Sequence, residues 1–182
     1  MIPKIIHYCW FGRTEKPKEV LEYIETWKQN LPDFEIREWN EDNFDVNIIP
    51  YTQEAYEAKK YAFVSDYARF WILYHHGGLY FDTDVEVIKD MDDIIARGSF
   101  MGREAGAFMM DSGNAVAPGL GIGVVSGLSL YKRLLEKYEN IFDQRIYNTE
   151  IQSYAKQMFF ASQAMKEDAL DNSVGQNFVF DM

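Results

Sequence analysis

Two neighbouring stretches decide the fold of this chain, Phe63-Val-Ser-Asp-Tyr-Ala-Arg69 and Gly77-Gly-Leu-Tyr-Phe-Asp-Thr-Asp84. Residues 62–76 contain strong helix formers and large apolar side chains without Gly or Pro, which predicts a helix. Gly77 and Gly78 supply a left-handed stop that a residue with a side chain would resist. The helix should therefore end near His76, and a strand should follow it.

A strand is predicted over residues 79–85, continuing to 89, because apolar and polar residues alternate there. Strand alternation would place Tyr80, Asp82 and Asp84 on one face. Two carboxylates at a strand end can bind one Mg²⁺ or Mn²⁺ ion, which takes oxygen ligands from protein and phosphate. We therefore predict a metal site at Asp82 and Asp84. The alternative is a solvated acidic turn, because Asp-x-Asp also occurs by chance in acidic proteins.

The preceding helix carries Ser65, Asp66 and Arg69 on neighbouring turns. Helical spacing predicts that these three residues face the polar side of the helix. They are candidates for binding a polar ligand beside the paired acids. The alternative is a surface ion pair between Asp66 and Arg69, which would stabilise the chain by less than about 1 kcal/mol.

Residues 4–10 form a short, mostly apolar run, which predicts a buried first strand. Ligands of α/β sheets collect at the carboxyl ends of strands, so Trp10 would lie where a nucleotide base can bind. From the local pattern alone, a core aromatic residue is the simpler interpretation of Trp10. His7 and Cys9 are predicted to be core or edge residues, because no second Cys or His lies at metal-ligand spacing.

Four motifs that occur in order resemble a known family: Ile5-Ile-His-Tyr-Cys-Trp-Phe-Gly12, Ser65-Asp66-x-x-Arg69, Gly77-Gly78-x-Tyr80 and Asp82-Thr83-Asp84. The chain is similar to the DXD-containing sugar-binding region of family 32-like glycosyltransferases, which include yeast-type α-mannosyltransferases and bacterial capsular polysaccharide enzymes. A more distant similarity extends to the clostridial glucosylating toxins. Each motif alone is weak, but their order makes the similarity specific over residues 2 to about 90.

The resemblance implies an α/β, GT-A-like nucleotide-sugar-binding fold with a central mixed sheet flanked by helices. It implies a metal-dependent, retaining hexosyltransferase in surface or capsular polysaccharide synthesis. The donor would be a nucleotide diphosphate sugar, with a UDP-sugar expected, and the acceptor a saccharide.

The resemblance also implies roles for individual residues. Asp82 and Asp84 would hold Mn²⁺ or Mg²⁺, and Asp82 would also approach the ribose. Asp66 and Arg69 would bind sugar hydroxyls, while Trp10 would stack on the base. The catalytic residues would be Asp66, Arg69, Asp82 and Asp84, and the substrate-binding residues Trp10, Ser65, Asp66, Arg69, Tyr80 and Asp82.

The composition of the 182 residues, 47% hydrophobic and 16% aromatic, predicts a globular domain and excludes intrinsic disorder. The formal net charge of −11 argues against nucleic acid as a partner. It also means that an anionic diphosphate needs a bridging cation, in agreement with the predicted metal site. Cys9 is the only cysteine, so no disulfide forms within the chain and a reducing compartment is favoured.

No run of about 18 apolar residues occurs, and the start of the chain has no signal-peptide pattern. We expect a cytoplasmic protein without a transmembrane segment. Peripheral association with the cytoplasmic face of the membrane is compatible with this expectation. We expect one catalytic domain over residues 1–182 that lacks the family's C-terminal segment. Two alternatives remain: a non-catalytic module that binds sugars or nucleotide sugars, and a metal-dependent nucleotide-sugar hydrolase.

Periodicity predicts further helices over residues 17–31, 51–60, 91–96, 128–138 and 150–166, and strands over 34–39, 100–102 and 177–180. A long loop over 104–118 would line the site, and its Asp111 and Asn114 are candidates for acceptor binding. The glycine-rich run 119–126 has Ser126 where a dinucleotide fingerprint needs its third glycine, so we predict a close-packed strand or turn.

Overall fold

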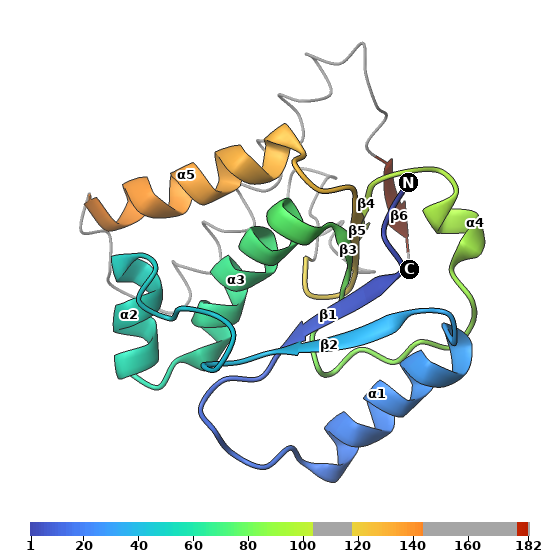
Figure 1. Ribbon diagram of the computed structural model, residues 1–182, viewed down its shortest axis with the longest axis horizontal. Helices are drawn as coiled ribbons and strands as arrows, with labels where there is room; N and C mark the ends of the chain where they lie inside the picture. The colour runs from blue at the N-terminus through green and yellow to red at the C-terminus, as the bar shows by residue number, and fades with distance from the viewer. Residues whose placement is uncertain (104–117, 144–177, 182) are drawn as a thin grey trace.

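The computed structural model describes residues 1–103, 118–143 and 178–181. Within this part of the chain, six strands form one mixed sheet in the order β2-β1-β3-β5-β4-β6 (Figure 1). The strands are β1 (Ile5–Cys9), β2 (Glu35–Trp39), β3 (Gly78–Tyr80), β4 (Phe100–Arg103), β5 (Ile122–Val124) and β6 (Phe178–Asp181). The helices are α1 (Lys18–Asn30), α2 (Pro50–Glu57), α3 (Tyr61–His76), α4 (Asp92–Ile95) and α5 (Ser129–Asp143). The predicted α/β class with a mixed sheet is confirmed, because β1 runs parallel to β2 and β3 while β5 runs antiparallel to β3 and β4.

Strand β1 lies between β2 and β3 in the sheet, so both of its edges are hydrogen-bonded, and its side chains pack in the core clusters on both faces. Successive side chains of a strand point to opposite faces. Ile6 packs in the cluster that contains Trp27 of α1, whereas Cys9 packs in the cluster formed by α2, α3 and α5. The indole N–H of Trp27 also donates a hydrogen bond to the backbone oxygen of Val85 (2.8 Å), which joins α1 to the segment after β3.

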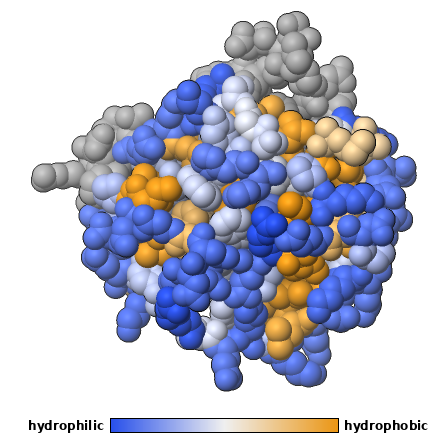
Figure 2. All heavy atoms as spheres, in the orientation of Figure 1, coloured by the Kyte–Doolittle hydropathy of each residue, from blue (hydrophilic) through white to orange (hydrophobic). Residues whose placement is uncertain are grey.

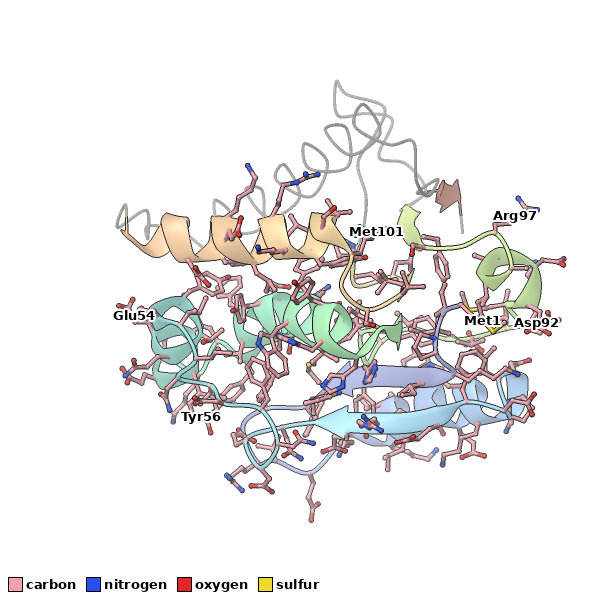
Figure 3. The ribbon with its side chains drawn as sticks, turned by 45° about the horizontal axis from the view of Figure 1, so that its top comes forward. Met1, Glu54, Tyr56, Asp92, Arg97 and Met101 are labelled. Carbon is pink, nitrogen blue, oxygen red and sulfur yellow. The ribbon has the colours of Figure 1, made fainter. Side chains whose placement is uncertain are left out.

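Helices α2, α3 and α5 pack on the face of the sheet opposite α1 (Figure 1). Helix α3 lies between α5 and strands β1 and β3 (Figure 3). Burial extends around much of α3 and includes Val64, Ala68, Phe70, Ile72 and Leu73, which have no exposed surface. Polar residues on this helix can therefore lie inside the molecule.

The predicted end of α3 at His76 is confirmed. Gly77 and Gly78 have φ angles of 65° and 102°, and a Cβ on Gly78 would lie 2.6 Å from the backbone oxygen of Ile5. His7 on β1 completes this junction: its Nε2 is 2.9 Å from the Gly77 oxygen, and its Nδ1 accepts a hydrogen bond from the indole of Trp39 (3.0 Å). His7 is thus a core residue, as predicted, and burial lowers its pKa to about 4.

The prediction of a strand over residues 79–85, continuing to 89, is wrong beyond Tyr80. The N–H of Phe81 still bonds to the His7 oxygen (3.2 Å), and that of Asp82 bonds to the Gly119 oxygen (3.0 Å). The chain then turns, with the Val85 N–H donating to the Asp82 oxygen (3.2 Å). Strand alternation therefore does not govern the directions of Asp82 and Asp84.

Most other elements agree with the predictions. Run 119–126 contains β5, and it is close-packed as predicted, because a Cβ on Gly123 would lie 2.2 Å from the Phe100 ring. The final strand appears as β6, parallel to β4. The predicted helix over 150–166 and the loop residues Asp111 and Asn114 lie outside the described residues.

The surface is mainly polar. Figure 2 shows hydrophilic residues over most of one face, with smaller apolar areas between them. None of the helices in the described ranges is long and apolar enough to cross a bilayer.

Candidate functional site

Asp66 and Arg69 form a buried ion pair on α3. An Nη of Arg69 donates to a carboxylate oxygen of Asp66 at 2.5 Å, and the two side chains are only 6% (Arg69) and 10% (Asp66) exposed. The surface-pair alternative is therefore wrong, because both side chains are buried. Burial acts to lower the pKa of Arg69, but the carboxylates of Asp82 and Asp66 outweigh it and raise this pKa above its ordinary value.

Arg69 also connects α3 to the end of β3. Its second Nη lies 3.5 Å from one carboxylate oxygen of Asp82, and its guanidinium lies 5.3 Å from the ring centre of Tyr80. The Tyr80 hydroxyl donates a hydrogen bond to the other oxygen of Asp82 (3.1 Å). The Asp82 side chain remains 34% exposed, so the protein holds this carboxylate in place while leaving it accessible.

Gly119 closes the other side of the same group. Its backbone oxygen accepts the N–H of Asp82, and a Cβ at this position would lie 1.9 Å from an Asp82 oxygen and 3.2 Å from the Arg69 guanidinium. Only a residue without a side chain leaves room for this arrangement. No local pattern predicts this role, because Gly119 lies far along the chain from Asp82 and meets it only through the β3–β5 pairing.

Trp10 lies at the predicted edge of the sheet. It follows β1, which pairs in parallel with β3 through His7 and Tyr80, so Trp10 and Asp82 both follow the carboxyl ends of adjacent strands. The Trp10 indole N–H donates to the Thr14 oxygen (2.8 Å), and its partly buried ring packs beside the cluster on the α1 side. This contact orients the ring at the sheet edge.

Two further polar groups surround the site. The Ser65 hydroxyl donates to the Tyr61 oxygen one turn earlier in α3 (3.2 Å), so in this structure it bonds to its own helix. Cys9 is buried near Tyr80 and Ser65, and burial raises the pKa of its thiol to about 12. A thiol with this pKa is protonated at neutral pH, so it is a poor nucleophile.

Residues 17–101 match the family model described as the glycosyltransferase sugar-binding region containing a DXD motif. The DXD motif of the match is Asp82-Thr83-Asp84. The match includes Asp66, Arg69, Asp82 and Asp84, and it excludes Trp10 and Gly119.

Several curated proteins are similar to the DXD region. An uncharacterized glycosyltransferase of Acanthamoeba polyphaga mimivirus is 37% identical over 106 residues, which are 55% of this chain and 42% of that protein. The initiation-specific alpha-1,6-mannosyltransferase of Candida albicans is 31% identical over 109 residues, covering 54% and 28% of the two chains. The inositol phosphoceramide mannosyltransferase 1 of Schizosaccharomyces pombe is 28% identical over 111 residues, covering 55% and 33%. The chain thus matches less than half of the length of each of these relatives.

A solved structure, the PaToxG glycosyltransferase, has a similar fold. The superposition covers 92% of this chain and 70% of that one, with a TM-score of 0.70 and 18% sequence identity. This likeness confirms the predicted GT-A-like fold, and at this identity it shows the fold alone.

The two carboxylates of the DXD motif supply the oxygen ligands that a hard divalent cation prefers. Asp84 is exposed in the turn after β3, and Asp82 is oriented by Arg69 and Tyr80. Among the described residues, no cluster of three or more His, Cys, Asp or Glu side chains could hold a metal ion. Mg²⁺ commonly binds one or two protein carboxylates together with substrate phosphates and water. The two aspartates therefore fit an ion that binds together with a diphosphate.

Proposed function

We propose that this chain forms the donor-binding and catalytic part of a metal-dependent, retaining glycosyltransferase. It would transfer a hexose from a nucleotide diphosphate sugar to a saccharide acceptor, in the synthesis of a surface polysaccharide. The observation that carries the proposal is the buried Arg69, which joins Asp66 on α3 to Asp82 of the DXD motif.

In this proposal, three groups of residues bind the donor. Trp10, after β1, would offer an aromatic face for the nucleotide base at the edge of the sheet. Asp82 and Asp84, after β3, would bind the diphosphate and ribose. Asp66 and Arg69 form the inner end of the site, where their hydrogen-bonding groups would hold the hydroxyls of the hexose.

The charges agree with this assignment. A bound Mn²⁺ or Mg²⁺ would stabilise the negative charge that develops on the leaving diphosphate. Arg69 would hold the Asp82 carboxylate in place for that ion. With a net charge of −11, the protein would bind a diphosphate weakly without a cation.

The names of the relatives suggest which sugar to test first. Two of the similar proteins are named as mannosyltransferases, so GDP-mannose belongs in the donor screen beside the UDP-sugars expected from the sequence. The acceptor and the cytoplasmic location, with or without peripheral membrane association, stay predictions. The single cysteine supports a reducing compartment.

Calorimetry with UDP-glucose, UDP-galactose and GDP-mannose tests the donor and the metal together. We expect binding in Mn²⁺ and a large loss of affinity in excess EDTA. Asp82→Ala and Asp84→Ala should abolish the effect of Mn²⁺, whereas Asp93→Ala, which removes an exposed acid of α4, should not. Undiminished donor affinity in EDTA would contradict the metal site.

Product analysis separates the proposed function from its two alternatives. With a saccharide acceptor, a transferase yields a new glycoside and a hydrolase yields free sugar. A binding module yields neither product, although it would still bind the donor.

A further inference from the structure

Tyr138 of α5 carries a buried hydroxyl without a hydrogen-bond partner. The residue is 5% exposed, and in the described part of the chain no group accepts from or donates to its hydroxyl oxygen. A buried hydroxyl that makes no hydrogen bond has lost its hydration without compensation. Phe would fill the same space without that cost, so the hydroxyl points to a state in which it is bonded.

Tyr138 packs against the part of α3 that carries Asp66. Its ring centre lies 5.7 Å from that of Tyr67, the residue after Asp66, and 6.4 Å from that of Phe70, one turn further along α3. On its other side the ring meets Tyr51 of α2 at 5.1 Å. Because Asp66 and Phe70 are four residues apart on α3, these contacts place Tyr138 against the face of the helix that carries Asp66.

The charge state of Tyr138 makes it a hydrogen-bond donor. Burial, together with the nearby carboxylate of Asp66, raises its pKa well above the ordinary value. The hydroxyl is therefore protonated at neutral pH. Asp66 is a suitable acceptor, because a carboxylate only accepts hydrogen bonds and its two oxygens offer about four lone-pair sites.

We propose that Tyr138 is a positioning residue that donates a hydrogen bond to Asp66 when the hexose of the donor is bound. This inference rests on the proposed function. A sugar hydroxyl that engages Asp66 draws the carboxylate away from its position in the unliganded chain. The Tyr138 hydroxyl then gains its missing partner and holds the carboxylate toward the sugar.

The inference predicts effects of opposite sign on stability and on binding. In Tyr138→Phe, the unliganded protein should melt at the same temperature as the wild type or higher. Its affinity for the nucleotide sugar in Mn²⁺ should fall at least about tenfold, the equivalent of one hydrogen bond to a charged group. Its affinity for the matching nucleoside diphosphate, which has no hexose, should not change.

Two further variants make the test specific. Tyr131→Phe removes the hydroxyl of another buried tyrosine on α5 and should leave both affinities unchanged. In an Asp66→Asn background, Tyr138→Phe should have little further effect on nucleotide-sugar affinity, because the two residues act through one hydrogen bond.

The outcomes separate this inference from the function on which it rests. If the wild type binds no nucleotide sugar in Mn²⁺, both are overturned. If the wild type binds and Tyr138→Phe binds equally well, only the role of Tyr138 is overturned. A lower melting temperature in Tyr138→Phe, or additive losses with Asp66→Asn, would also overturn it.

Discussion

Replacing Arg69 by Met tests the energetic consequence of burying the Asp66–Arg69 ion pair. The burial of the two side chains predicts how much folding stability the variant loses. Met replaces the aliphatic part of Arg but carries no positive charge. It therefore leaves the Asp66 carboxylate, whose side chain is 10% exposed, without the Arg69 cation. Breaking a buried ion pair by removing one partner typically costs about 3–5 kcal/mol of folding stability. Asp82 is 34% exposed and can be hydrated by water, so it should contribute little to the loss.

Urea unfolding followed by circular dichroism, without ligand, measures this loss. The control is Lys18→Met, which breaks the exposed ion pair between Lys18 and Glu22 (2.7 Å). This variant should lose less than about 1 kcal/mol of folding stability. The double variant Asp66→Leu/Arg69→Met should regain much of the stability, because it leaves no unpaired buried charge. A loss in Arg69→Met as small as that in Lys18→Met would refute the reasoning.

The same pair should act on catalysis in variants that remain folded. Asp66→Asn and Arg69→Lys preserve approximate size and should reduce turnover at least about tenfold, which corresponds to roughly 1.4 kcal/mol in the barrier. Affinity for the nucleoside diphosphate should change little. Wild-type transfer rates in both variants would show that the pair is structural.

Three further predictions concern neighbouring positions. Gly119→Ala should displace the Asp82 carboxylate and weaken Mn²⁺-dependent donor binding on the order of tenfold, whereas Gly123→Ala should lower stability without this effect. Because the pKa of His7 falls from 6.5 to about 4 on folding, the folded chain binds fewer protons than the unfolded chain between these pH values. Unfolding free energy should therefore drop by up to about 3 kcal/mol as pH falls through that window, and His7→Gln should show a shallower dependence in urea titrations at pH 7.5 and 4.5. Trp10→Ala should weaken nucleoside diphosphate and nucleotide sugar equally, by about 1–3 kcal/mol in calorimetry, while a change in melting temperature alone would support a core role.

The local elements of the fold could be predicted from the sequence because short-range chemistry controls them. Helix formers without Gly or Pro specify α3, and the positive φ angles required at Gly77 and Gly78 end it where predicted. The order of the four motifs was enough to predict the sugar-binding region and the GT-A-like fold. These signals depend on residues that are close in the chain.

The tertiary structure decided what surrounds those residues. The same spacing of Asp66 and Arg69 occurs in exposed and buried pairs, and only the packing of α3 between α5 and the sheet buries this one. The strand after Gly77 stops at Tyr80 because the chain turns at Asp82, whose backbone oxygen accepts the N–H of Val85. Contacts of Gly119 and Tyr138 with the site join segments far apart in the chain, so no local pattern could reveal them.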